Sequence, residues 1–237
     1  MNECNIQLIK TYLKNPYYRK PTNQSTRSII KILLSIFLLS ILYAFPLGII
    51  SHLTSNFLHL NHLSGIVSRQ QLIIKAVIMA PILEELTFRG FLNLKPRWIL
   101  FSILLYPGLL IYHWGKTFLT PHWLLLPLIL ATIIGITLLL SKPNVHWVKI
   151  RRFGRKNFRL LVYFSILSFG FVHVTNFTPM NGQTLLFTPL LVLPQLLLAL
   201  FLSFIRIHFG LVYSILFHFS WNFLITLPAL LKLLSNL

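Results

Sequence analysis

Residues 76–94 read AVIMAPILEELTFRGFLNL, an apolar stretch that carries two adjacent glutamates and an arginine. An ionisable side chain at the centre of a membrane helix costs about 2.5–3.5 kcal/mol on insertion scales. Glu84, Glu85 and Arg89 would therefore be costly if they faced lipid, so we expect them to face the protein interior. The stretch predicts a helix inside a membrane bundle, with its charges paired in the protein interior.

The spacing of these three residues gives them different partners. Glu85 and Arg89 are four residues apart on one helix face, with the glutamate first, which is the favourable order for an ion pair. Glu84 is rotated about 100° from Glu85 and is left for another role. Pro81 removes one helical hydrogen bond and can open the helix near the carboxylates. The alternative is a buried charge cluster with a structural role alone.

The composition of the whole chain supports a membrane protein. Its 237 residues are 56% hydrophobic and 10% charged, with a mean hydropathy of +0.76. Soluble proteins carry about 25% charged residues, so the composition argues against a cytosolic globular enzyme. The formal net charge is +18, but the hydropathy argues against nucleic-acid binding. There is no Asp, the third glutamate is Glu3, and the single Cys4 excludes an intramolecular disulfide and a multi-Cys zinc site.

Seven apolar runs follow one another along the chain. Because a transmembrane helix needs about 20 apolar residues, we predict an all-α, polytopic transmembrane helical bundle of about seven spans, with six to eight as the limits. The third run is short and contains Pro107 and Gly108, so we consider a re-entrant or broken segment there. The runs lie near residues 29–51, 71–94, 98–113, 122–140, 159–176, 184–205 and 210–231.

The basic residues predict an orientation in the membrane. With the N-terminus inside and seven alternating spans, most of the 21 Lys and Arg residues fall in cytoplasmic segments, as the positive-inside rule requires. Three fall outside, namely Arg69, Lys116 and Lys232, whereas Arg206 falls in the last inside turn. We therefore predict a multi-pass integral membrane protein in contact with the bilayer and without a nucleic-acid partner. Residues 1–28 form a basic cytoplasmic tail, either on anionic lipid or solvated, and residues 29–237 form one membrane domain.

Two later runs carry polar residues at helical spacing. In FGFVH, Phe169 and His173 are four apart, and Gly170 allows another helix to approach closely. In HFSWN, His218 and Asn222 are likewise four apart. His and Asn need polar partners inside a membrane, so we expect both motifs to face the glutamates. A packing role for each histidine is the alternative.

Together, EELTFR, FGFVH and HFSWN fit the patterns EExxxR, FxxxH and HxxxN, in this order on membrane helices. The ordered triple resembles the CPBP family of CAAX-processing and bacteriocin-processing intramembrane proteases. That family includes Ras-converting prenyl-protein endopeptidases and lysostaphin-resistance and Abi-type bacterial proteins. The resemblance covers about residues 70–225. It implies an intramembrane endopeptidase in a bacterial cell membrane, acting on a prenylated or otherwise membrane-associated protein, or on a small peptide precursor.

The resemblance also implies roles by position. Glu84 corresponds to the catalytic glutamate, which activates a water with help from His173. His218 and Asn222 would stabilise the oxyanion that forms at the peptide carbonyl. In the predicted topology Glu84 leans to the inner half of the membrane and His173 to the outer half, so broken or re-entrant helices would have to bring them together. The supporting residues are Glu85, Arg89 and Phe169.

Several alternatives stay open at this point. Glu84, His173 and His218 could hold zinc with a water in the fourth position. Because HExxH is absent, we expect a metal-free mechanism without a cofactor, with zinc as the alternative. A bacteriocin self-immunity protein would act by binding, with or without cleavage. A proton-coupled transporter could use the same residues as a relay, but no duplicated halves are evident. The sequence does not give an oligomeric state.

Overall fold

The structure is a computed structural model and is predominantly helical, as predicted. It describes residues 7, 9, 11–12, 14–19, 24–62, 74–114, 130, 132–135 and 143–234. Strands β1 (Asn61–His62) and β2 (Phe177–Thr178) form a short antiparallel ribbon. The helices within these residues are α2 (Thr26–Phe57), the π-helix η2 (Ile74–Met79), α4 (Ala80–Arg89), the 3-10 helix η3 (Gly90–Asn93), α5 (Pro96–Trp114), α7 (Pro143–Lys156), α8 (Phe158–Val172), the 3-10 helix η4 (His173–Asn176), α9 (Gly182–Leu186), α10 (Thr188–Leu191), α11 (Leu193–His208) and α12 (Leu211–Leu234).

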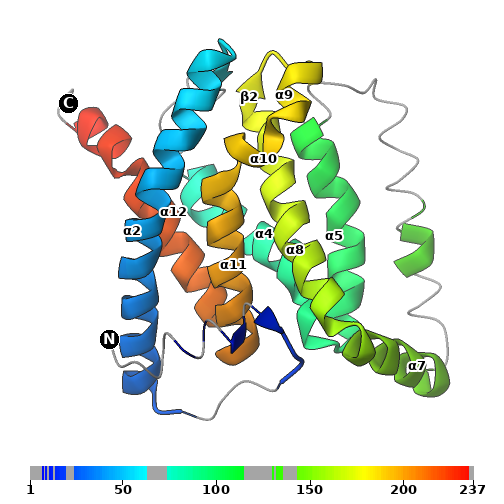
Figure 1. Cartoon of the computed structure of the whole chain (residues 1–237). Coiled ribbons are helices and arrows are strands. Elements are labelled where there is room, and N and C mark those ends of the chain that lie inside the picture. The colour runs from blue at the N-terminus through cyan, green and yellow to red at the C-terminus, as the bar shows by residue number, and fades with distance from the viewer. Residues whose placement is uncertain are drawn as a thin grey trace.

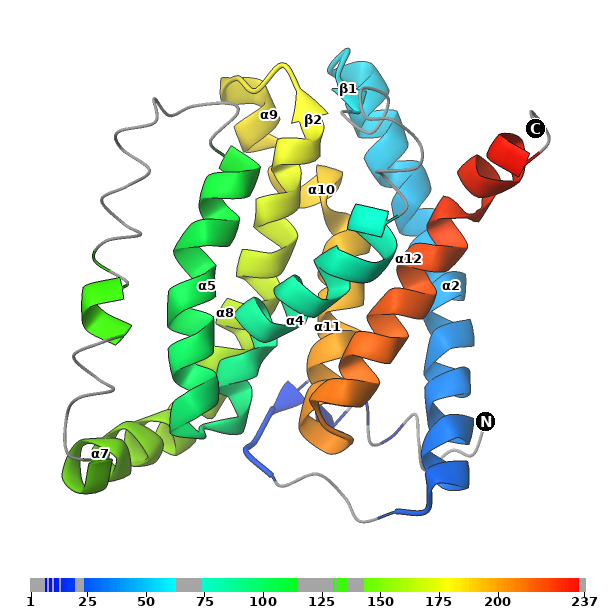
Figure 2. The same ribbon diagram turned by 180° about the vertical axis from the view of Figure 1, so that it is seen from behind.

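Helix α11 is the centre of the bundle. It packs against α2, α8 and α12, and α4 crosses behind it in contact with α5 and α12 (Figure 1). The view from behind shows α4 running obliquely between α5 and α12 (Figure 2). Gly170 of α8 faces α11, where a Cβ atom would collide with the side chain of Leu196. The close helix approach predicted at Gly170 is therefore confirmed.

Three helical segments among the described residues are long and apolar enough to cross a membrane. They are Thr26–Phe57, Phe158–Asn176 and Leu211–Pro228. Helix α2 exposes large apolar side chains, including Leu42 and Phe45, and an exposed apolar surface of this kind suits contact with lipid. The chain is an integral membrane protein.

The predicted count of about seven spans is not confirmed. The second run is divided into η2, α4 and η3, and the sixth into α9, α10 and α11. Pro81, Pro189 and Pro194 lie at the starts of α4, α10 and α11, because proline lacks the N–H that a continuing helix would use. The third run is one helix that continues through Pro107 rather than breaking there. The fourth run lies largely outside the described residues.

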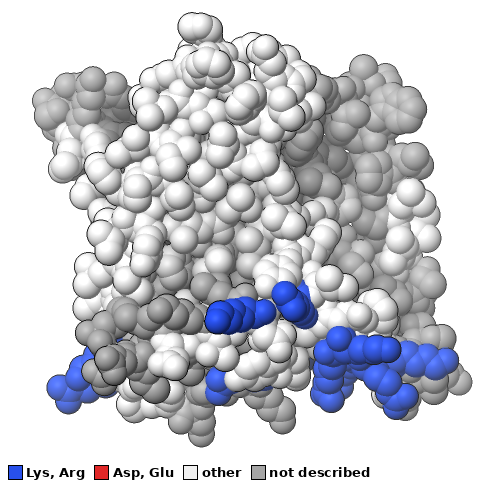
Figure 3. Space-filling view, in the orientation of Figure 1, with Lys and Arg blue, Asp and Glu red and all other residues white. Residues whose placement is uncertain are grey.

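Lys and Arg side chains gather at one end of the bundle on the face shown in Figure 3. Helix α7 crosses this end, and α2 and α8 begin there (Figure 1). A one-sided distribution of this kind is what the positive-inside rule leads us to expect. The assignment of this end to the cytoplasm stays a prediction.

Candidate active site

The paired glutamates lie on α4, which follows the π-helix η2 directly. Pro81, in the first turn of α4, has no N–H to donate to the preceding turn, so it marks the change from π-helical to α-helical backbone. Such π-helical turns frequently occur at functional sites. Glu84 and Glu85 are both buried, so their charges depend on partners from the surrounding helices.

Glu85 forms the predicted ion pair with Arg89. The distance from Glu85 Oε1 to Arg89 Nη1 is 2.6 Å, and neither side chain is exposed. The Arg89 guanidinium also lies over the ring of Phe169 on α8, with Cζ 4.1 Å from the ring centroid. This cation–π contact connects the ion pair on α4 to the FxxxH segment.

Glu85 also contacts α12, and one of its partners there, Ser214, was not identified from the sequence. Ser214 Oγ donates a hydrogen bond to Glu85 Oε2, and His218 Nδ1 lies 3.1 Å from Glu85 Oε1. Ser214, His218 and Asn222 recur every four residues and so form one polar stripe on α12. That spacing is the signal that could have added Ser214 to the site.

His218 lies between the two glutamates. Its Nδ1 faces Glu85, and its Nε2 is 3.7 Å from Glu84 Oε2. This separation is too long for a direct hydrogen bond, but both atoms can contact one shared water. The structure thus brings Glu84 and His218 together, as expected, with Glu85 on the other side of the imidazole.

The FxxxH residues reach this cluster through the Phe169 ring. His173 is the first residue of η4, and its Nδ1 is 2.7 Å from the carbonyl oxygen of Phe169. The Phe169 ring centroid is 4.7 Å from that of His173 and 5.7 Å from that of His218. Helix α8 ends immediately before His173, so the backbone changes from α to 3-10 there, in keeping with the expected broken helix.

Asn222, one turn after His218, contacts the π-helix. Its Nδ2 donates a hydrogen bond of 2.8 Å to the carbonyl oxygen of Ala76 in η2. This bond ties α12 to the segment that precedes the glutamates. Nδ2 carries a second hydrogen. Donation of a hydrogen bond to an oxyanion would use this second hydrogen.

Glu84 lines an apolar cavity of about 510 Å³ between α4 and α5. Among the described residues, the cavity wall is mostly Leu, Met, Ala and Gly, with Lys75 and Thr87 as the other polar residues. Glu85 and Arg89 are not part of this wall. The two adjacent glutamates therefore face different surroundings, as their angular separation on the helix predicts. The lining residues are Lys75, Met79, Ala80, Leu83, Glu84, Thr87, Leu104, Leu105, Gly108 and Leu109.

Comparison with known proteins gives the family of the chain. The family model of the type II CAAX prenyl endopeptidase Rce1-like proteins matches residues 69–224, which is more than half of the chain. The chain belongs to this family. The matched region contains all three motifs, so the resemblance to CAAX-processing proteases is confirmed. No curated protein and no solved structure matches the chain.

Zinc is the alternative to a metal-free mechanism, and its candidate ligands are Glu84, His173 and His218. A catalytic zinc needs three protein ligands and a water. Within the part of the chain that the structure describes, no three His, Cys, Asp or Glu side chains are grouped so that they could hold a metal ion. Glu84, His173 and His218 therefore do not form such a group among these residues, and the metal-free mechanism stays a prediction.

Arg206 is buried, whereas the sequence predicted it in a turn outside the membrane helices. The predicted topology puts it in a cytoplasmic turn, whereas the structure buries it in the last turn of α11. Arg206 Nε donates to the carbonyl oxygen of Arg89 at 3.0 Å, and Nη2 donates to that of Gly90 at 3.3 Å. Carbonyl groups at the end of a helix lack helical partners, so Arg206 fixes the C-terminal end of the helix that carries the glutamates.

Proposed function

We propose that this protein is an intramembrane endopeptidase that hydrolyses a peptide bond with a water activated by Glu84 and His218. One observation carries the proposal. The Glu84 carboxylate lies on the wall of an apolar cavity, 3.7 Å from a histidine that is itself held by Glu85. A purely structural charge cluster has no need of a carboxylate at a cavity wall. Membership of an endopeptidase family supports the same reading.

The contact between His218 and Glu85 favours one arrangement of hydrogens. Glu85 is paired with Arg89, and an ionised carboxylate only accepts hydrogen bonds. His218 Nδ1 would then donate to Glu85, which leaves Nε2 of a neutral imidazole as an acceptor on the Glu84 side. A water there could donate one hydrogen to Nε2 and one to Glu84. In this proposal His218 lies beside the nucleophile, whereas the family resemblance implies a role at the oxyanion.

The proposed reaction uses Glu84 first as a base and then as an acid. The water oxygen attacks the peptide carbonyl carbon while Glu84 accepts the water proton. The carbonyl oxygen becomes an oxyanion, and a hydrogen-bond donor in a water-poor site stabilises it strongly. Asn222 is the proposed donor, and His173 is proposed to assist the water. The C–N bond then breaks, Glu84 returns its proton to the leaving nitrogen, and the products are a carboxylic acid and an amine.

The cavity favours a substrate that carries an apolar group. Each buried CH₂ group contributes about 0.8 kcal/mol, so a hydrocarbon chain in a largely apolar space of 510 Å³ would bind well. A prenylated or otherwise lipidated protein segment is therefore the favoured substrate class. A small membrane-associated peptide precursor is the second class.

Cleavage of defined peptides by the purified protein tests the proposal. The panel consists of a farnesylated CAAX peptide, the same peptide without the farnesyl group, and a short peptide precursor, with products identified by mass spectrometry. Glu84→Gln should abolish cleavage, because it removes the base and keeps the shape. Glu3→Gln is the matched control, since Glu3 is the only acidic residue of the chain outside the pair.

Two results would contradict this function. One is cleavage by Glu84→Gln at the wild-type rate. The other is a wild-type protein that binds the peptides and leaves each of them intact, which would favour the alternative of a bacteriocin self-immunity protein that acts by binding.

A further inference from the structure

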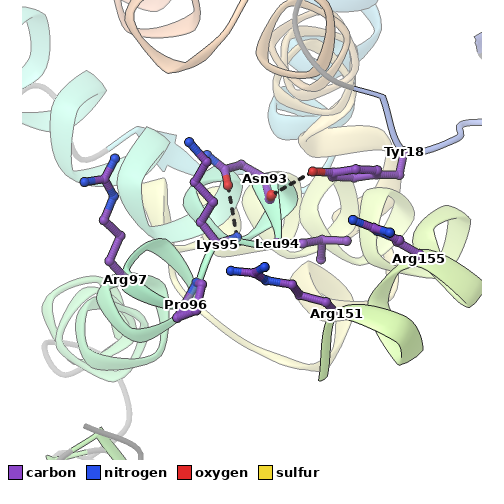
Figure 4. A pocket seen from close by; sticks show the side chains of 8 residues that line it. All are labelled: Tyr18, Asn93, Leu94, Lys95, Pro96, Arg97, Arg151 and Arg155. Carbon is purple, nitrogen blue, oxygen red and sulfur yellow. Dashed lines mark hydrogen bonds between the residues drawn. The ribbon is translucent and has the colours of Figure 1, made fainter. Parts of the chain in front are cut away.

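A second cavity, of about 560 Å³, lies at the charged end of the bundle. It is bounded by the junction of η3 and α5, by α7 and by the N-terminal segment that carries Tyr18 (Figure 4). The residues that line it are Tyr18, Asn93, Leu94, Lys95, Pro96, Arg97, Arg151 and Arg155. We call this cavity the basic cleft, because four of its eight lining residues are Lys or Arg.

The shape of the basic cleft is fixed by contacts among the residues that line or border it. Tyr18 Oη donates to the carbonyl oxygen of Asn93 at 3.3 Å, and the Asn93 side chain accepts from the backbone N–H of Lys95 at 3.0 Å (Figure 4). Arg155 lies over the Tyr18 ring, with Cζ 5.3 Å from its centroid. Gly154 of α7 packs on Leu94 so closely that a Cβ atom would collide with it. The cations therefore project from a built wall.

No side chain of the described structure supplies a negative charge to the basic cleft. The lining contains no carboxylate, and the whole chain has no Asp and three Glu. Glu84 and Glu85 are engaged at the candidate active site, and Glu3 lies outside the described residues. Cations held close together repel one another. An anion from outside the chain would relieve that repulsion.

The charged region continues beyond the basic cleft. An adjoining cavity of about 410 Å³ shares Tyr18, Asn93 and Lys95 with it and adds Arg19 and Arg206 to its wall. Arg206 is the residue that holds the end of α4. The two cavities together offer space and positive charge for more than a simple monovalent ion.

The position of the basic cleft favours a lipid as the source of the anion. Arg97 and Phe101 are four residues apart on α5 and therefore lie on the same helix face. Phe101 is 51% exposed, so an exposed apolar side chain lies one helical turn after a cation of the basic cleft. Phe153 of α7 and Leu160 of α8 are each 66% exposed nearby in the chain. Basic residues next to exposed apolar ones are typical of sites for anionic lipid headgroups. We propose that the basic cleft binds the phosphate of an anionic phospholipid headgroup.

Lipid binding to the full-length protein in detergent tests this proposal. Phosphatidylglycerol is titrated and the rise in the thermal unfolding midpoint gives an apparent Kd. Arg151→Gln/Arg155→Gln should weaken binding by roughly 25-fold, since each cation near an anionic lipid contributes a factor of about five. Lys149→Gln/Arg152→Gln is the matched control, because it removes the same charge from exposed positions on α7 that do not line the cleft. Its Kd should stay within about twofold of wild type.

A second variant and three further ligands make the outcome decisive. Arg97→Gln, on a different helix, should also weaken binding, by about fivefold, so the test does not depend on the folding of the double variant. Equal losses in the lining and control variants would show diffuse surface attraction and overturn the proposal. Stabilisation by phosphatidylcholine, inorganic phosphate or a polyglutamate peptide equal to that by phosphatidylglycerol would also overturn it, in favour of a non-specific lipid, free phosphate or an acidic protein.

Discussion

Replacing Glu85 by glutamine removes one half of an ion pair that is wholly buried. The charged atoms of Glu85 and Arg89 are 2.6 Å apart, and neither side chain is exposed. Breaking a buried pair by removing one partner costs about 3–5 kcal/mol, because the other charge is left uncompensated. We expect the upper part of this range, since the carboxylate also accepts from Ser214 and contacts His218.

The same substitution at Glu84 is the matched comparison. Glu84 contacts His218 at the longer distance of 3.7 Å, so Glu84→Gln should cost about 1 kcal/mol or less. For a chain of this size, each kcal/mol shifts the unfolding midpoint by about 2–4 °C. Glu85→Gln should therefore lower the midpoint by about 8–20 °C and Glu84→Gln by about 4 °C or less. Tryptophan fluorescence during heating of the detergent-solubilised protein measures both shifts.

A double variant separates the charge from the packing. Glu85→Gln/Arg89→Met leaves no unpaired charge, and replacement of a buried pair by uncharged residues is often close to neutral. The double variant should consequently be more stable than Glu85→Gln alone. Equal unfolding midpoints for Glu84→Gln and Glu85→Gln would refute the reasoning. So would a double variant whose midpoint falls below that of Glu85→Gln by as much again as Glu85→Gln falls below wild type.

Two other expectations concern the cavity and the metal. Gly108 lines the cavity beside Glu84, and a Cβ atom there would meet no atom within 4 Å. Gly108→Leu should therefore fold normally. It should raise KM for a farnesylated peptide by roughly tenfold or more, because each CH₂ group displaced from the cavity contributes about 0.8 kcal/mol. Gly48→Leu on α2, where a Cβ atom is equally unobstructed, should leave KM unchanged, and an unchanged KM in both variants would contradict a lipid-binding cavity. Purified protein should carry no stoichiometric zinc and keep its activity in chelator; about one zinc per chain, lost with activity and restored by added zinc, would contradict the metal-free mechanism.

The sequence predicted the parts of the site that depend on spacing along one helix. The Glu85–Arg89 pair follows from a four-residue interval, which places two side chains on one face wherever the helix lies. The different surroundings of Glu84 follow from the same geometry. Gly170 was identified because a residue without Cβ permits close approach, and α11 occupies that place.

The contacts that the sequence missed depend on how whole helices are placed and rotated. Ser214 meets Glu85 only because α12 turns its polar stripe toward α4, and no local pattern sets that rotation. A lone cation after an apolar run, such as Arg206, indicates a cytoplasmic end. Its burial arises because α11 ends beside the last turn of α4. The span count stays unconfirmed for a related reason, since hydropathy does not distinguish one continuous helix from a succession of π, α and 3-10 segments.

The adjacency of the two glutamates has a physical reason in this bundle. Glu85 pairs with Arg89 on its own helix and contacts a serine and a histidine on α12. Arg89 in turn lies over the Phe169 ring of α8, so the pair connects three helices. Glu84, about 100° further round the helix, reaches the cavity beside α5 instead. His218 lies close to both glutamates. Glu85, which connects the helices, therefore also orients His218, which is proposed to act on the water. Because the membrane domain has no third acid, a change at Glu85 should reduce activity through the orientation of His218 as well as stability.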